Sequence, residues 1–413
     1  MLQQLVKARS YGSGRADCLK RVITSQRLAE LELSPEIDLG RHHAKAVTSV
    51  DFENSTGRYL LSGGVDGTIL IYDVQCYPDG SHTECPVVAK ARFGSNQEQR
   101  RNPFHFASTD NKHSISAVSW YPHDTGIFLS SSTDETLKVW DTNTMSVAEE
   151  FELDDIVYHH AMPTSSSHFL VAAGDRNGVI TLCDIKSGSA IHVLRHHKQS
   201  VFALDWSPSS DFILASAGRD NTILLWDIRK VGGPLVSLDQ HNGAGVASTS
   251  SILTAHNGAI NGLCFTDEGR WIVSYGTDYR LRMWDALNGR NMLINYGRVT
   301  NWFSGHCQLA VTTCGHTSKG GGFIFVPSGH DIVVLDLMSG KRLGVLEGHF
   351  RTVNCCALHP YEQILFSGGN DCKLLAWSPK RPVVKETHTA RLNTHNQSTP
   401  INAYQDSWSD DET

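Results

Sequence analysis

Residues 219–230 read RDNTILLWDIRK, an apolar run that begins soon after one aspartate, Asp220, and ends on a second, Asp227. Ile223 and Leu225 occupy alternate positions, and β-branched and aromatic residues are typical of strands, so the run predicts a short packed β-strand. A single Trp-Asp phrase would occur by chance. The phrase decides the fold because it returns, with altered wording, along the chain.

Seven such phrases occur, and neighbouring ones are 42 to 68 residues apart. A base period slightly above forty residues with insertions is typical of propeller blades, each built from four short antiparallel strands. The phrases are Ile71-Tyr72-Asp73, Val139-Trp140-Asp141, Leu182-Cys183-Asp184, Leu225-Trp226-Asp227, Met283-Trp284-Asp285, Val334-Leu335-Asp336 and Ala376-Trp377-Ser378.

Five of the repeats share further polar positions at fixed spacing. An aspartate lies seven residues before the end of the phrase, a serine four residues before that aspartate, and a histidine 17 to 19 residues before the serine. With the aromatic residue of the phrase, the five sets are His43, Ser62, Asp66 and Tyr72; His113, Ser130, Asp134 and Trp140; His197, Ser216, Asp220 and Trp226; His256, Ser274, Asp278 and Trp284; and His349, Ser367, Asp371 and Trp377.

Serine, histidine and aspartate together could form a hydrolase triad. Five equivalent sets, one in each of five repeats, would share no common cleft, so we expect structural networks in which buried polar groups satisfy one another. The pairs His42-His43, His159-His160 and His196-His197 resemble metal ligands, but each falls at or near the start of a blade. We therefore expect neither a catalytic residue, nor a metal site, nor a cofactor.

Two repeats depart from this pattern and should be held by apolar packing instead. They carry Ala173, Asn177 and Cys183 in one case and Phe325, Gly329 and Leu335 in the other. No phrase precedes His43, so we expect residues 37–39 to supply the fourth strand of the last blade and to close the ring.

The composition limits the class of protein. The formal net charge is −7 and no run of adjacent Lys and Arg residues exceeds two, as at Lys380-Arg381, which argues against a direct, sequence-specific nucleic-acid binder. Ten scattered cysteines without a CxxC pair suit reduced thiols. The absence of a long apolar run or a leader-like start predicts a soluble intracellular protein with no membrane partner.

The phrases resemble those of the WD-repeat family of seven-bladed β-propellers, over residues 36–378. Five longer stretches, several of them outside the repeat consensus, resemble its CSA branch, which acts in transcription-coupled repair. These stretches are WYPHDTGIFLSSSTDETLKVWDTNT (120–144), TLCDIKSGS (181–189), LDQHNG (238–243), TAHNGAINGLCFT (254–266) and LINYGRV (293–299). The expected architecture is all-β, with an N-terminal helix-loop-helix in residues 1–35 and a polar, disordered tail in residues 379–413.

The N-terminal segment has two helix-like runs, residues 2–10 and 15–35, joined by YGSG. We expect the second helix to end near Ser34-Pro35, because proline disfavours helix in the residue before it. Propellers that serve as substrate receptors of cullin–RING ubiquitin ligases insert such a helix-loop-helix into a DDB adaptor, and many carry a Trp-Asp-x-Arg box. The resemblance thus implies adaptor-binding roles for Leu2, Leu5, Val6, Leu19, Val22, Ile23 and Arg229. The open alternatives are helices that dock on their own propeller and a surface ion pair for Arg229.

By resemblance, the chain would be the non-catalytic substrate-recognition subunit of the ligase, acting in the nucleus. Its partners would be the DDB adaptor, the cullin and RING subunits indirectly, the CSB remodeller and stalled RNA polymerase II. The other interpretation is a general WD-repeat scaffold or chromatin reader without a ligase. Two insertions, residues 74–112 and 230–255, are rich in Gly, Ser and Asn and predict surface loops whose role the sequence leaves open.

Overall fold

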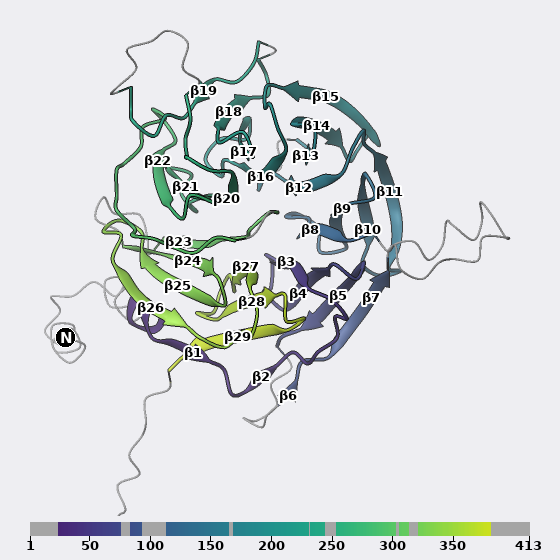
Figure 1. The fold of residues 1–413 in the computed structure, drawn as a ribbon. Helices are drawn as coiled ribbons and strands as arrows, with labels where there is room; N and C mark the ends of the chain where they lie inside the picture. Colours follow the sequence, from purple (N-terminus) through teal and green to yellow (C-terminus); the bar gives the residue numbers. More distant parts are fainter. Residues whose placement is uncertain are drawn as a thin grey trace, which may run out of the picture. The chain divides into compact units, whose positions relative to one another are not determined.

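The fold is a ring of seven antiparallel sheets (Figure 1), seen in a computed structural model that describes residues 24–75, 83–92, 113–164, 168–230, 232–243, 253–302, 305–313 and 321–380. The described residues belong to one unit, which ends at Lys380. Residues 1–23, with the expected first helix and Leu2, Leu5, Val6, Leu19, Val22 and Ile23, lie outside the described residues, as does the expected tail from residue 381.

The first four sheets follow the chain in order. Blade 1 contains β3 (Val47–Phe52), β4 (Tyr59–Gly64), β5 (Thr68–Asp73) and β7 (Val87–Arg92); blade 2 contains β8 (Ile115–Trp120), β9 (Ile127–Ser132), β10 (Thr136–Asp141) and β11 (Ser146–Glu152); blade 3 contains β12 (Val157–Ala161), β13 (Leu170–Asp175), β14 (Val179–Asp184) and β15 (Ser189–Arg195); blade 4 contains β16 (Val201–Trp206), β17 (Ile213–Gly218), β18 (Ile223–Asp227) and β19 (Val236–Ser237).

The remaining sheets complete the ring. Blade 5 contains β20 (Ile260–Phe265), β21 (Trp271–Gly276) and β22 (Leu281–Asp285); blade 6 contains β23 (Ala310–Thr313), β24 (Gly322–Ser328), β25 (Asp331–Asp336) and β26 (Arg342–Leu346); blade 7 contains β27 (Val353–Leu358), β28 (Leu365–Gly369), β29 (Leu374–Pro379) and β1 (Leu31–Leu33). A small parallel pair, β2 (Ile37–Asp38) and β6 (Thr83–Glu84), lies beside blade 1. The expected seven-bladed propeller is confirmed.

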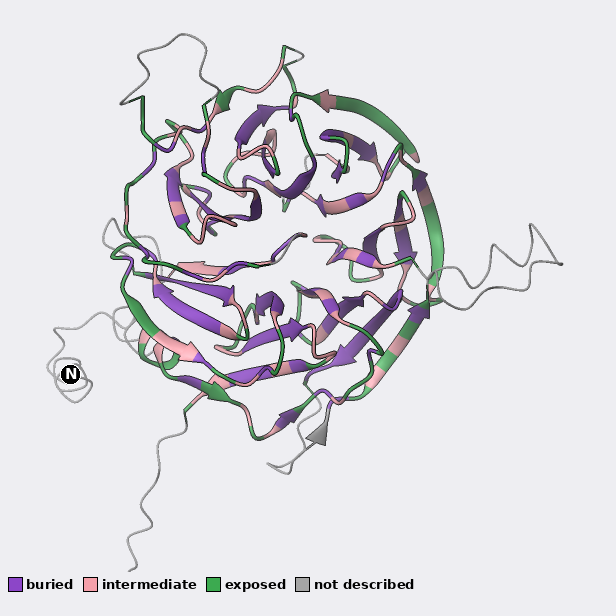
Figure 2. Cartoon of the chain, in the orientation of Figure 1, coloured by how far each residue is buried: buried purple, intermediate pink, exposed green. Residues whose placement is uncertain are grey.

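The second and third strands of the blades are the most buried, whereas the outer strands are the most exposed (Figure 2). The seven phrases of the sequence end the third strands, and β18 is buried at every position. The outer strands β11 and β15 are mostly exposed, because nothing in the described ring covers them. The packed space therefore lies between neighbouring blades, where seven apolar clusters fill it.

The turn between the second and third strands has the same backbone in most blades. The residue after the turn aspartate has a positive φ in five blades, whether or not it is glycine: Gly67, Glu135, Asn221, Tyr279 and Cys372. A positive φ strains residues that have a Cβ, so the surrounding hydrogen bonds must hold this conformation. In blades 4 and 7 the aspartate provides them, since its carboxylate accepts one N–H from the turn itself, from Thr222 or Lys373, and one from the loop before the first strand, from Lys198 or Phe350.

The ring is closed by the N-terminal segment, but not by the residues that the sequence indicated. β1 pairs with β29, with Leu31 opposite Pro379 and Leu33 opposite Trp377, and so supplies the fourth strand of blade 7. Residues 37–39 lie beyond it, and Ile37–Asp38 pairs in parallel with β6. The expected closing strand was thus placed six residues too late, since β1 has only one fully buried side chain and a helix-like composition.

The expected second helix also ends earlier than predicted. Residues 24–29 are helical and residues 31–33 form a strand, so the helix does not reach Ser34-Pro35. Leu28 is 2% exposed and packs with Leu31, Leu346 and Trp377, so this end of the helix docks on the propeller itself. The boundary expected after residue 35 therefore cuts through the last blade.

The first insertion is not one loop. The outer strand β7 divides it, so residues 74–86 follow a third strand whereas residues 93–112 lead to the next blade. The two parts therefore leave blade 1 at opposite faces of the ring. Most of their residues, 76–82 and 93–112, lie outside the described ranges. Among the described residues, no helical segment has both the length and the apolar character needed to cross a bilayer.

Candidate functional site

The polar positions of the sequence pattern meet inside four blades. In blade 4, His197 Nε2 is 2.7 Å from Ser216 Oγ, and Trp226 Nε1 donates to the same oxygen at 2.8 Å. His197 Nδ1 is 3.0 Å from Asp220 Oδ2. Blades 5 and 7 repeat this arrangement with His256, Ser274, Asp278 and Trp284, and with His349, Ser367, Asp371 and Trp377. Blade 1 has His43, Ser62 and Asp66 in the same relation.

These contacts determine which atom donates and which accepts in each hydrogen bond. The carboxylate accepts the Nδ1 proton of histidine, so the neutral ring presents Nε2 as an acceptor for the serine hydroxyl. The serine oxygen then accepts the tryptophan N–H. Each group is satisfied, which matters because the serine of every blade network is 0% exposed. We call this the blade network.

The network aspartates hold their charge. Burial favours the neutral acid, but hydrogen bonds from His256 and Arg282 outweigh it and keep the pKa of Asp278 well below the usual range. The pKa values of Asp66, Asp220 and Asp371 are lowered in the same way, against burial, by their histidines. Charged carboxylates at physiological pH therefore fix the turns between the second and third strands.

Blades 1 and 2 differ from the predicted pattern. In blade 2, Trp140 Nε1 donates to Ser130 Oγ at 2.7 Å, and Asp134 binds Thr136 and Lys138. His113, however, is exposed and has no described contact with Ser130, so its predicted place in a buried network is wrong. In blade 1 the hydroxyl of Tyr72 is buried without a well-formed hydrogen bond in the described structure.

Blades 3 and 6 replace the network with apolar packing. Ala173 and Cys183 are buried in one core cluster, and Phe325 and Leu335 in two others. At the turn of blade 3, Asp175 Oδ1 accepts the N–H of Val179 at 2.7 Å. Asp175 lies two residues before Asn177, which occupies the usual position of the aspartate.

The networks do not form a catalytic site. They lie in different blades, and their serine side chains are closed to solvent, so no substrate could reach a nucleophile. Within the described ranges, no group of three or more His, Cys, Asp or Glu side chains is arranged to hold a metal. Of the twin histidines, His43 and His197 belong to blade networks.

A histidine cluster that the sequence did not predict lies near the ring centre. The ring centroids of His159 and His306 are 3.8 Å apart and stacked, and the neighbouring His160 binds Ser119 Oγ at 2.6 Å and Ser131 Oγ at 2.9 Å. Burial lowers the pKa of His160 to about 3 and that of His306 to about 4. His159 and His306 are 147 residues apart in the sequence, so no local pattern could have paired them.

Two partly buried carboxylates that the sequence analysis also missed join neighbouring blades. Asp51 on β3 accepts the N–H of Trp120 on β8 at 2.8 Å, and Asp205 on β16 accepts the N–H of Phe265 on β20 at 2.6 Å. Burial raises the pKa of both carboxyl groups to about 7. These contacts are interblade clamps, formed between inner strands.

Arg229 forms an ion pair within its own loop. Its Nε and Nη2 atoms donate to the two carboxylate oxygens of Asp227, both at 2.9 Å, and its guanidinium lies 4.5 Å from the centroid of the Phe212 ring. The side chain is still 60% exposed. The geometry thus shows the surface ion pair left open by the sequence, while the outer edge of the guanidinium remains accessible.

Arg229 and the N-terminal helical residues lie on one face of the ring. We call the face that carries the loops of His43, His197, His256 and His349 the histidine face. Third strands start there, so Asp227 and Pro379 end on the opposite face. Lys380 N donates to Glu30 O at 3.0 Å, which places residues 24–30 on that opposite face too. They pack on blades 6 and 7, however, whereas Arg229 lies on blade 4.

Comparison with known proteins places this architecture in a family. The repeat model described as "WD domain, G-beta repeat" matches residues 36–73, 105–141, 188–227, 247–285 and 340–378, which end at the third strands of the five blades with a conforming aspartate and serine. The WD repeat-containing protein ATCSA-1 of Arabidopsis thaliana is 31% identical, over 93% of this chain and 96% of that protein. The chain belongs to the WD-repeat family. It is a CSA-like member, similar to ATCSA-1 over nearly the whole length of both chains.

More distant relatives share the repeats. The histone acetyltransferase type B subunit 2 of Candida glabrata is 26% identical over 54% of this chain and 48% of its own length. The E3 ubiquitin-protein ligase COP1 of Arabidopsis thaliana is 23% identical over 69% of this chain and 37% of its own length. WD-repeat propellers generally act as non-catalytic scaffolds.

Removing the serine of a blade network should destabilise the propeller. Ser216→Ala takes the acceptor from Trp226 and the donor from His197, and we expect the free energy of unfolding to fall by about 1–3 kcal/mol, measured by chemical denaturation. Trp226→Phe on the Ser216→Ala background should cost less than Trp226→Phe alone, because the indole N–H has already lost its partner. Full additivity in this double-mutant cycle would contradict the network.

The histidine cluster should make stability depend on pH. Below pH 6.5 the unfolded chain binds a proton at His160, whereas the folded chain does not until about pH 3. The folded state therefore loses about 1.4 kcal/mol per pH unit from this group as the pH falls. His160→Gln should remove that loss, so the unfolding free energy of the unaltered chain should fall relative to the variant by about 2 kcal/mol between pH 6.5 and pH 5.

The comparison at each pH removes contributions common to both chains, including those of Asp51 and Asp205. The control is His192→Gln, which changes an exposed histidine on β15 of the same blade. The unfolding free energy of this variant should depend on pH in the same way as that of the unaltered chain. Parallel pH curves for His160→Gln and the unaltered chain would show that the buried ring does not resist protonation.

Proposed function

We propose that this chain is the substrate-recognition subunit of a cullin–RING ubiquitin ligase in transcription-coupled nucleotide excision repair, working in the nucleus. It would perform no chemistry. It would bind the DDB adaptor, and through it the cullin and RING subunits, while the propeller holds repair and transcription proteins, the CSB remodeller and stalled RNA polymerase II among them. The single observation that carries this proposal is the similarity to ATCSA-1 along almost the entire chain.

Two further observations support a ligase role. COP1, a more distant relative, is an E3 ubiquitin-protein ligase by name. The N-terminal residues 24–30 and Arg229 share the face opposite the histidine face, which is the arrangement needed if both contact one adaptor. Because blade 5 separates blade 4 from the segment's docking site on blades 6 and 7, the adaptor would contact two separate points.

This arrangement leaves the histidine face free. An adaptor bound to the opposite face would hold the propeller in a fixed orientation, because the seven closely packed sheets move little relative to one another. Substrates on the histidine face would then lie at a fixed height above the ligase arm. We therefore propose that adaptor and substrates bind opposite faces of the ring.

Removing residues 1–23 should abolish capture of the DDB adaptor. The deletion stops before Leu28 and β1, because a cut to residue 34 would remove the closing strand of blade 7. The shortened chain should keep the cooperative melting of the full chain, measured by circular dichroism, and lose adaptor capture in a pull-down with purified adaptor. Adaptor capture by the shortened chain at full strength would refute the N-terminal part of the proposal.

Arg229→Ala should weaken adaptor binding about three- to tenfold, the range expected for one exposed arginine at an interface rim. The matched control is Arg270→Ala, which removes another arginine from the same face, one that also lies over an aromatic ring, Trp271, at 4.7 Å. Calorimetric titration with the adaptor should leave the Arg270→Ala affinity within twofold of the unaltered chain. Equal losses of adaptor affinity for both variants would contradict a specific contact of Arg229 and show that it contributes only positive charge.

The similarity to a histone acetyltransferase subunit favours one other function, a chromatin scaffold without a ligase. Affinity purification from nuclei, with and without transcription-blocking damage, separates the two. Recovery of adaptor, cullin and polymerase supports the repair ligase. Recovery of histones with no cullin subunit supports the scaffold.

A further inference from the structure

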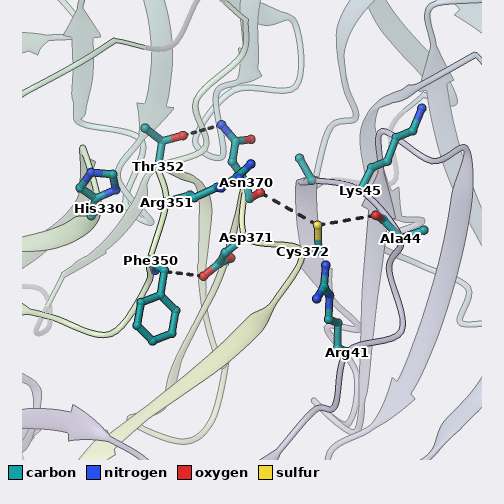
Figure 3. Close-up of a pocket in the computed structure, with 11 residues that line it drawn as sticks. Arg41, Ala44, Lys45, His330, Phe350, Arg351, Thr352, Asn370, Asp371 and Cys372 are labelled. Carbon is teal, nitrogen blue, oxygen red and sulfur yellow. Dashed lines mark hydrogen bonds between the residues drawn. The ribbon is translucent and has the colours of Figure 1, made fainter.

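The histidine face carries an open cleft where the first and last blades meet. It has a volume of about 870 Å³ and is walled by loops at residues 41–46, 350–352 and 370–372, with His330 of blade 6 at one end. Figure 3 shows Arg41 and Lys45 on one side, Phe350 and Arg351 on the other, and Cys372 between them. These residues come from four turns on three blades, brought together by ring closure.

The cleft is cationic in a chain whose formal net charge is −7. Arg41, Lys45 and Arg351 are exposed, and no described residue forms an ion pair with any of them. The carboxylate in the lining, Asp371, is already engaged, since it accepts from His349 Nδ1 at 2.9 Å and from Phe350 N at 3.2 Å. The three cations are therefore free to bind an anionic partner.

An aromatic ring adds a second kind of contact. Phe350 is 78% exposed, an unusual position for a phenylalanine, and Lys373 Nζ lies 5.5 Å from its ring centroid. Exposed aromatic side chains beside cationic ones are typical of protein-binding surfaces, where the ring covers an apolar group and the cations bind acids around it.

The walls of the cleft are preorganised. Asn370 donates to the hydroxyl of Thr352, and its own Oδ1 accepts from Asn354 Nδ2 at 2.8 Å. Cys372 has a positive φ of 64° and its Sγ donates to the carbonyl of Ala44 at 3.7 Å, which ties the turn of blade 7 to the loop of blade 1. A fixed cleft loses less conformational entropy on binding than a loose one.

We infer that this cleft binds an acidic linear segment of a partner protein, with an apolar side chain on Phe350 and carboxylates on Arg41, Lys45 and Arg351. A protein that binds a nucleic-acid duplex contacts roughly six to ten phosphates along an extended surface. Three cations in one cleft therefore suit a short acidic peptide better than a duplex. The inference names the partner chemistry of the face left free by the adaptor, and to that extent it rests on the proposed function.

The test uses the full chain and a fluorescein-labelled heptapeptide with a central leucine and three glutamates on each side. Fluorescence anisotropy should show saturable binding that weakens about fivefold or more between 50 and 300 mM salt, because exposed ion pairs are screened. The same peptide with glutamine in place of glutamate should bind at least tenfold more weakly. A labelled 20-base-pair DNA duplex is titrated in parallel.

The variants locate the binding site. Lys45→Gln with Arg351→Gln should weaken peptide binding at least about fivefold, and Phe350→Ala about threefold or more. Lys198→Gln is the matched control, because Lys198 is an exposed cation in the equivalent loop of blade 4 and should leave binding unchanged. Circular dichroism melting of each variant verifies that these exposed changes leave the fold intact.

Three results would overturn the inference: no saturable binding to the acidic peptide, undiminished binding by the Lys45→Gln and Arg351→Gln double variant, or tighter duplex binding through the same cations. Adaptor capture, measured on the same proteins, should be unaffected by all four substitutions. Peptide binding without adaptor capture would contradict the proposed function but support the cleft assignment. Adaptor capture without peptide binding would support the proposed function but contradict the cleft assignment.

Discussion

The pairing of β1 with β29 is the constraint on which the rest of the molecule depends. The last blade takes its fourth, outer strand from the start of the described chain, so backbone hydrogen bonds hold the two ends of the ring together. Ser34 N donates to Ala376 O at 2.8 Å and Lys380 N to Glu30 O at 3.0 Å, so the join extends beyond the three paired residues at both ends. The ring is therefore closed by hydrogen bonds between residues more than 340 positions apart.

Closure also positions both candidate interaction surfaces. It anchors residues 24–30 on the face opposite the histidine face, the side on which Arg229 is exposed. On the histidine face it sets the loop of Arg41 and Lys45 beside the turn of Cys372, and so creates the basic cleft. The same strand pairing thus supports the proposed adaptor site on one face and the proposed peptide cleft on the other. The blade networks stiffen the sheets between them and take no part in chemistry.

Repetition made much of this predictable from the sequence. The seven phrases identified the third strands, and period-two alternation put Ile223 and Leu225 on one packed face, while Leu224 and Trp226 pack in another cluster on the other face. The His, Ser and Asp of four blades were found because their spacing recurs. His113 fits that spacing but lies on the surface, which shows that spacing alone does not bury a side chain.

Features that depend on single long-range contacts could not be predicted from the sequence. Leu31–Leu33 reads as helix because Leu and Glu favour helices, and only pairing with β29 makes it a strand. The His159–His306 stack joins different blades without a repeated motif. The Asp51 and Asp205 clamps do recur, eight residues after His43 and His197 in the first strands of two blades, and the sequence analysis missed this recurrence. The cleft is likewise a product of loops from three blades, each of which reads as an ordinary turn.

Amide hydrogen exchange of the full chain, followed by mass spectrometry, tests the closure most directly. Peptides covering residues 30–34 and 374–380 should exchange as slowly as those covering the buried strand β18, because opening the join requires unfolding of the blade. Both should lose protection together as denaturant is added. Fast exchange of residues 30–34 in a chain whose β18 stays protected would show an open last blade and contradict this account.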